Sequence, residues 1–125
     1  MALFASGVSG FLAVALGAFG AHGLRGKLAA LEDGSKRLEW WTTAAHYQLA
    51  HALALGLCAY LATRTSSVAV QVATLAFIVG TVLFSGSLYA MTLTGVRALG
   101  AVTPLGGLGF LVGWVCVALA AVKLR

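Results

Sequence analysis

The chain has 125 residues, a length that suits a single domain. Hydrophobic residues make up 61% of it and charged residues only 9%, whereas a soluble domain carries about 25% charged residues. So few charges cannot cover a water-facing surface, and lipid is the expected solvent for most of the chain. The formal net charge is +5, but the basic residues form no cluster with interleaved aromatic side chains. We therefore expect a lipid bilayer as partner and no nucleic acid.

Four stretches without charged residues are long enough to cross a bilayer, which takes about 20 helical residues. Backbone groups in lipid must bond within their own segment, and the alternating pattern of barrel strands is absent, so we expect helices. The sequence predicts an all-α, polytopic membrane protein, a four-transmembrane-helix bundle, with one domain over residues 1–125. The expected helices cover residues 2–23, 36–63, 67–94 and 104–123. No basic residue precedes the first stretch, so we expect a retained helix rather than a signal peptide.

The ends of the expected helices carry capping and interfacial residues. Ser35 is placed to serve as the N-cap of the second helix. Trp40 and Trp41 then mark the membrane interface, as aromatic belts do. Thr103 followed by Pro104 indicates the start of the fourth helix, with the threonine as N-cap and the proline as the first helical residue.

Basic residues between the helices predict an orientation. Four crossings place both termini on one side of the membrane. That side carries Arg64, Lys123 and Arg125, and the other side carries Arg25, Lys27, Lys36, Arg37 and Arg97. By the positive-inside rule we expect the termini outside and loops 1 and 3 in the cytoplasm, in a bacterial-type plasma (inner) membrane. Residues 25–31 are expected to lie on the membrane surface as a short amphipathic segment.

Small residues recur at every fourth position in three of the expected helices, with Ala52 and Gly56 in the second. The helix-packing candidates are Gly17, Ala21, Gly109 and Gly113. Such stripes allow close approach of membrane helices, where dispersion forces replace the hydrophobic effect. Two interpretations stay open: the stripes form a homo-oligomer interface, or they pack helices within one chain.

Polar residues inside a membrane helix are functional candidates by default. Tyr47, Gln48 and His51 share one face of the second helix, and His51 lies near the middle of the bilayer. The functional interpretation is a proton relay, a haem ligand or a contact to a polar substrate. The structural alternative is a neutral imidazole bonded to a neighbouring helix.

The third helix carries a polar stripe that must face protein or water. Its members are Gln71, Thr74, Thr81, Ser85, Tyr89 and Thr92, with Ser87 and Thr94 to another side. The stripe predicts either one wall of a polar pathway or hydroxyl groups that bond back to carbonyl groups of their own helix.

A second polar group is expected at the end of the helices that leans toward the cytoplasm. His22, His46, Arg97 and Thr103 fall at the same level there. They are placed to surround a headgroup or an anion, or to reach interfacial water individually.

Several motifs of catalysis and metal binding are absent from the sequence. No Asp or Glu lies inside an expected helix, and no H-E-x-x-H, C-x-x-C, P-loop or G-x-S-x-G motif occurs. Cys58 and Cys116 each lie alone in an apolar stretch, as small core residues do. We therefore expect no catalytic residue, no metal site and no cofactor.

Four short motifs stand in order along the chain. They are GAFGAHG at 17–23, YQLAHALAL at 47–55, FSGSLY at 84–89 and TPLGG at 103–107. Together they resemble the small membrane-protein family that includes bacterial YgdD and the mammalian transmembrane protein 256. The resemblance implies a four-helix inner-membrane protein from a family labelled as a domain of unknown function. The shared polar positions that it implies are His22, Tyr47, Gln48, His51, Ser85, Ser87, Tyr89, Thr103 and Pro104.

Three classes of function remain open on this sequence. The first is a structural, assembly or interaction protein of the plasma membrane that associates with itself or with a larger membrane complex. The second is a small oligomeric transporter or channel with a polar path between the second and third helices. The third is a haem-binding or lipid-modifying membrane enzyme. The absence of a catalytic motif favours the first class.

Overall fold

The computed structural model describes residues 1–124, and over that range the chain is helical without strands. The elements in chain order are α1 (Ala2–Phe19), the π-helical turn η1 (Gly20–Leu24), α2 (Arg25–Leu28), α3 (Gly34–Arg64), α4 (Val68–Thr94), the 3₁₀ turn η2 (Arg97–Ala101) and α5 (Thr103–Val122). The all-α class predicted from the sequence is confirmed.

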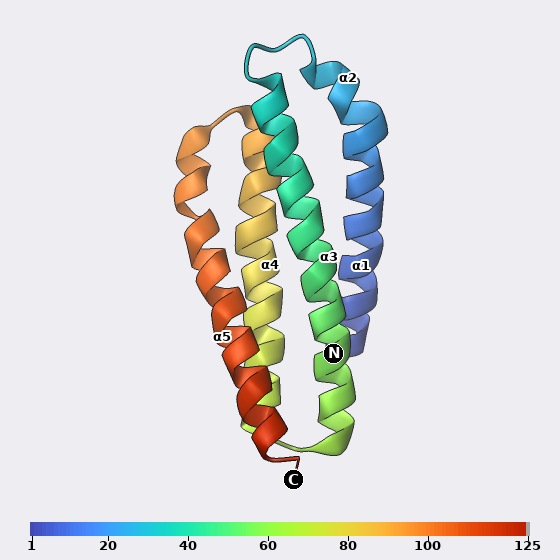
Figure 1. Ribbon diagram of the computed structural model, residues 1–125, viewed down its shortest axis with the longest axis vertical. Helices are drawn as coiled ribbons and strands as arrows, with labels where there is room; N and C mark the ends of the chain where they lie inside the picture. The colour runs from blue at the N-terminus through green and yellow to red at the C-terminus, as the bar shows by residue number, and fades with distance from the viewer. Residues whose placement is uncertain (125) are drawn as a thin grey trace.

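The four long helices form an antiparallel row in which each packs mainly on its neighbours in space. α1 packs on α3, α3 on α4, and α4 on α5, while α3 touches α5 only slightly. Figure 1 shows this order from α1 on the right to α5 on the left. Within residues 1–124 no extensive interface joins α1 to α5, so the row is open rather than closed into a ring.

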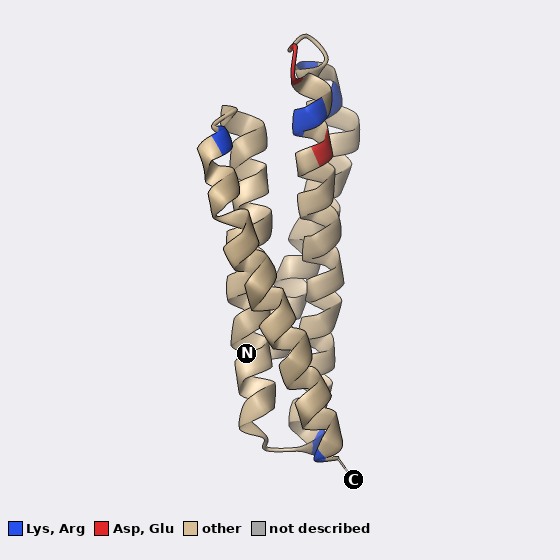
Figure 2. Cartoon of the chain, turned by 60° about the vertical axis from the view of Figure 1, so that its left-hand side comes forward, with Lys and Arg blue, Asp and Glu red and all other residues tan. Residues whose placement is uncertain are grey.

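The outer surface is apolar, and several polar side chains are buried among the apolar residues between the helices, as expected for a protein in lipid. Phe4, Phe11 and Leu53 are largely exposed, whereas Gln48 and His51 are buried. The charged residues gather at the ends of the helices (Figure 2). By length and composition three helical segments are apolar enough to cross a membrane: Ala2–Leu28, Val68–Thr94 and Arg97–Val122.

The first helix does not end where the sequence suggested. The π-helical turn at Gly20–Leu24 carries it on into α2, which ends at Leu28 and leans toward α3 (Figure 1). A Cβ at Gly20 would collide with the indole of Trp41, so glycine permits the close approach of α3 at this turn. Residues 25–28 are therefore a continuation of the helix, which corrects the separate surface segment expected there.

The N-cap residues predicted for two helices are wrong. α3 begins at Gly34 with Asp33 as N-cap, two residues before the expected N-cap Ser35. A Cβ at Gly34 would collide with the Leu28 carbonyl group, so the turn requires glycine at this point. α5 begins at Thr103 with Val102 as N-cap, because the Thr103 hydroxyl group bonds to another helix instead of capping its own.

Glycines hold α4 and α5 in close contact. A Cβ at Gly106 would collide with the backbone of Phe84, and one at Gly113 would collide with the ring of Phe77. Gly109 lies against the backbone of Gly80. This interface places the aromatic residues of α5 beside α3 and so shapes the site described next.

Candidate functional site

His51 is a neutral, fully bonded imidazole. Its Nδ1 lies 2.7 Å from the Tyr47 carbonyl oxygen of its own helix, which only accepts, so Nδ1 carries the proton. Its Nε2 then accepts a hydrogen bond of 3.2 Å from the indole N–H of Trp114 on α5. The ring stacks on Phe110 at a centroid distance of 3.5 Å and an interplanar angle of 8°. Both ring nitrogens are thus engaged within the chain, as the structural alternative for this residue requires.

Gln48 joins three helices through its amide group. Its Nε2 donates to the Ser9 carbonyl oxygen of α1 at 3.3 Å, and its Oε1 accepts from the Tyr89 hydroxyl group of α4 at 2.8 Å. The carbonyl of Ser9 can only accept, which fixes the orientation of the amide. Gln48 is 6% exposed, so these bonds satisfy groups that neither water nor lipid reaches.

Two residues of the polar stripe of α4, Ser85 and Thr92, bond to backbone carbonyl groups of α3. Ser85 donates to the Ala44 carbonyl oxygen at 2.7 Å. The Thr92 hydroxyl group lies 3.0 Å from the carbonyl oxygen of Arg37 and 2.9 Å from that of Leu88. Thr74 donates to its own helix, at the carbonyl oxygen of Val70. Gln71, by contrast, is exposed and lies outside this seam.

Ser87 and Thr103 join α4 to the start of α5. Ser87 donates to the Phe84 carbonyl oxygen at 2.9 Å, so the Thr103 hydroxyl group donates to Ser87 Oγ at 2.6 Å. The pair fixes the depth at which α5 begins relative to α4. The pair therefore has a structural role, since it sets the register between α4 and α5.

The polar group expected at the loop end of the helices is not assembled. His22 is exposed on the π-helical turn, and His46 lines a groove between α1 and α3 together with Arg25. Arg97 instead lies over the Trp40 ring, with its Cζ 5.8 Å from the ring centroid. Thr103 is engaged with Ser87, as described above. These residues thus occupy separate surroundings.

Two residues that the sequence did not single out as polar contacts tie helices together. Trp41 was expected at the membrane interface, but it is 3% exposed and donates from its indole N–H to the Leu16 carbonyl oxygen of α1 at 2.7 Å. Arg37 pairs with the Asp33 carboxylate at 3.0 Å and donates to the Thr92 carbonyl oxygen at 3.4 Å. Its guanidinium thus lies at the C-terminal end of α4, where a positive charge is favourable.

Three of the helix-packing candidates face other helices of the same chain. The Cα of Gly17 faces Ala45 on α3, while Gly109 and Gly113 face α4. Ala21 is exposed on the π-helical turn. These three glycines therefore pack helices within one chain, which is the second of the two interpretations given for the small-residue stripes.

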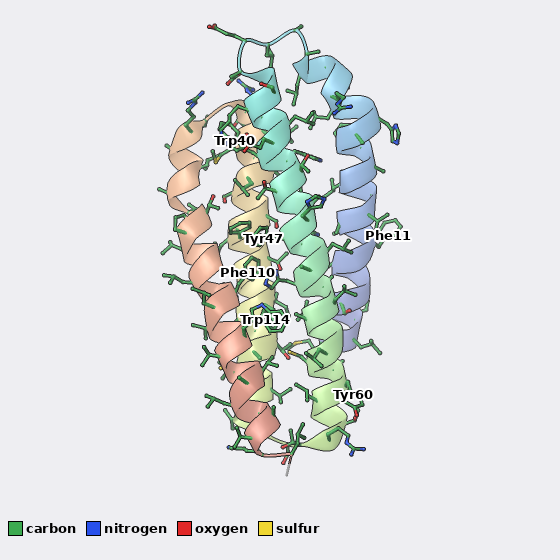
Figure 3. All side chains as sticks on the ribbon, in the orientation of Figure 1. Phe11, Trp40, Tyr47, Tyr60, Phe110 and Trp114 are labelled. Atoms are coloured by element: carbon green, nitrogen blue, oxygen red, sulfur yellow. The ribbon has the colours of Figure 1, made fainter. Side chains whose placement is uncertain are left out.

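A groove of about 600 Å³ opens between α3 and α5, and we refer to it as the α3–α5 groove. Tyr47 and His51 contribute from α3, Phe84 from α4, and Pro104, Phe110 and Trp114 from α5. Figure 3 shows Tyr47, Phe110 and Trp114 in the space between these two helices. The lining is almost wholly apolar and aromatic, with no charged side chain among the residues that form it.

A second, smaller groove of about 270 Å³ runs between α1 and α4 beside Gln48. Ser9 Oγ and Thr81 Oγ1 are buried beside it without a hydrogen-bond partner among residues 1–124. Rotation of either hydroxyl group toward a carbonyl of its own helix would satisfy it, as serine and threonine do in membrane helices.

An apolar exterior, polar seams between long helices and charges confined to the helix ends define an integral membrane protein. Residues 16–107 match the family described as "Protein of unknown function (DUF423)". The chain belongs to this family, and the resemblance drawn from its four motifs is confirmed.

Named relatives cover nearly the whole chain. The UPF0382 membrane protein YwdK of Bacillus subtilis is 45% identical over 93% of this chain and 91% of its own length. The UPF0382 inner membrane protein YgdD of Escherichia coli K12 is 42% identical over 100% of this chain and 91% of its own length. A UPF0382 membrane protein of Staphylococcus epidermidis is 44% identical over 93% and 90%, respectively. No solved structure matches the chain significantly.

Proposed function

We propose that all four long helices cross the membrane, including α3. α3 has 31 residues and is therefore about 46 Å long, which exceeds the thickness of a bilayer core. It packs lengthwise between α1 and α4, both of which are apolar enough to cross. Its charged residues stand in its first turns and at Arg64, with none between them. A helix between two crossing helices, with charges only at its ends, is expected to cross with them.

The proposed orientation follows from the charges at the two ends. Four crossings leave both termini on one side, and the positive-inside rule places loops 1 and 3, with the larger number of Lys and Arg residues, in the cytoplasm. The relative YgdD is named an inner membrane protein, which supports a plasma-membrane location.

Within this frame, the proposed function is association: a structural or assembly protein that binds a second copy or a larger membrane complex. The observation that carries the proposal is the open row. α1 packs mainly on α3, and in the first span only 6% of the apolar stretch is buried, against 33% in α4. An edge helix so little covered by its own chain is suited to contact another protein.

The polar side chains support association over transport. Gln48, His51 and Ser85 each bond to groups of the same chain, which leaves little hydrogen-bonding capacity for a solute. A polar path through α3 and α4 would need free groups along it. Haem ligation by His51 is disfavoured as well, because its Nε2, the nitrogen that would bind the iron, already accepts a hydrogen bond from the Trp114 indole.

Photo-crosslinking from the outer face of α1 tests this function. Phe11 is 74% exposed and points away from the other helices (Figure 3), so a photoreactive residue there should capture a protein neighbour in native membranes. Gly7 has no atom within 4 Å of a built Cβ, so Gly7→Leu leaves the protomer intact and should reduce the capture. Gly86→Leu on α4, equally open, is the control. Capture of lipid alone at Phe11 would refute the proposal.

A further inference from the structure

The α3–α5 groove has a polar donor that its own chain does not use. Tyr47 is 46% exposed, and its hydroxyl group has no hydrogen-bond partner among residues 1–124. The other polar groups beside it, His51 and Trp114, are bonded to each other. A phenol O–H that faces hydrocarbon without an acceptor is unfavourable, so an acceptor from outside the chain would stabilise it.

The depth of this donor restricts the acceptor. Tyr47 follows Trp40 by seven residues, which places it about 10 Å deeper along α3. On the four-crossing arrangement proposed above, that depth lies in the hydrocarbon core, below the headgroups. A phospholipid headgroup is therefore too shallow, and the partner must carry its hydrogen-bond acceptor inside the core.

The lining restricts the partner further. Two aromatic side chains of the lining are open to a ligand, Tyr47 at 46% and Trp114 at 44% exposure, whereas Phe110 is buried under the His51 ring. Aromatic faces of this kind favour a flat ring. No charged side chain lines the groove, so a neutral ligand is expected.

From these features we propose that the α3–α5 groove binds an isoprenoid quinone, a neutral flat ring with carbonyl acceptors on an apolar tail. The ring lies against the exposed part of Trp114, and one quinone carbonyl oxygen accepts from the Tyr47 hydroxyl group. The tail leaves the groove through its open side into the bilayer. The proposal concerns binding alone, and it rests on the crossing arrangement but not on association with another protein.

The test is the thermal unfolding of the purified protein in detergent, titrated with decylubiquinone. A ligand that binds only the folded state raises the unfolding midpoint in a saturable manner. Decylbenzene, which has a ring and the same alkyl tail but no carbonyl group, should raise it far less. Tyr47→Phe removes only the unpaired hydroxyl group and should weaken the affinity for decylubiquinone about fivefold.

Filling the groove gives an independent variant. Gly107 lines it, and a Cβ there would make only an ordinary contact of 4.0 Å with Phe84, so Gly107→Leu should fold and lose binding. Tyr60→Phe and Gly86→Leu make the same chemical changes at exposed positions outside the groove and should bind like the unaltered protein.

Three results would overturn the proposal: no saturable rise with decylubiquinone, an equal rise with decylbenzene, or unchanged affinity in Tyr47→Phe. None of them affects the crosslinking expected from α1, so the two proposals fail separately. The unfolding transition without ligand shows in the same experiment whether each variant is folded. If Gly107→Leu does not fold, the affinity of Tyr47→Phe for decylubiquinone still tests the proposal.

Discussion

Gln48 illustrates what a single polar residue does inside this protein. One amide group serves α1 and α4 at once, so its loss leaves the Ser9 carbonyl and the Tyr89 hydroxyl groups without a partner. Lipid cannot replace these bonds, as water would at a soluble surface. Side chains of this kind hold membrane helices in register where the hydrophobic effect gives no direction.

At the residue scale we predict that Gln48→Leu lowers the free energy of unfolding by about 1–2 kcal/mol, the cost of leaving buried partners unpaired. Gln71→Leu is the matched control, because Gln71 is exposed on α4 and should tolerate the change. The measurement is reversible unfolding in mixed detergent micelles. Equal stability of the two variants would show that the Gln48 bonds contribute nothing.

The sequence identified the polar residues of the seams but not their partners. Their position inside an expected membrane helix was enough to single out Gln48, His51, Ser85 and Tyr89. In the structure each of them contacts another helix. The partners could not be derived, because they depend on the rotation of each helix about its axis. Trp41 was assigned to the interface for the same reason, since its neighbour Gly20 lies on another helix.

At the element scale, the interface between α4 and α5 depends on backbone contact. Gly106 lies where any Cβ would meet the backbone of Phe84, which has no flexible end to move aside. The helices must therefore separate to accommodate a side chain, and the loss extends along the interface.

We predict that Gly106→Ala destabilises the protein by about 1–3 kcal/mol through this overpacking. Gly86→Ala on α4 has open space and should instead gain about 0.5–1 kcal/mol from the better helix propensity of alanine. Thermal melts of the two variants beside the unaltered protein measure the difference. A Gly106→Ala protein as stable as Gly86→Ala would contradict the close packing of α4 and α5.

The helices themselves followed from the sequence more readily than their ends did. Long stretches without charge marked α4 and α5, whose apolar composition leaves few alternatives in lipid. The π-helical turn at Gly20–Leu24 was not predicted, and the contact that Gly20 makes there with Trp41 of α3 is between residues far apart in the sequence. Likewise Gly34 begins α3 because it packs on Leu28, a contact that no capping rule contains.

At the scale of the whole molecule, the sequence predicted a bundle, while the described chain is an open row. A hydropathy pattern gives the number of apolar helices but not which of them pack together. The row has a consequence for topology, because α3 lies between two apolar helices and is expected to cross with them.

Reporter fusions test this topology. A reporter active only in the cytoplasm, fused within loop 1 near Ala30 or within loop 3 near Ala98, should be active, whereas a fusion after Thr65 should be silent. An α3 that does not cross would place loops 1 and 2 on the same side. Matching activity at Ala30 and Thr65 would therefore rule out the four-crossing arrangement.

The central claim is that this protein works by association through the uncovered edge of its helix row. Native mass spectrometry of the protein, released gently from its own membranes, tests that claim most directly. The account predicts a mass that contains a second copy or another protein, and it predicts that Gly7→Leu on α1 reduces that species while Gly86→Leu does not. A monomer free of any protein partner, in both the unaltered protein and the Gly7→Leu variant, would contradict it.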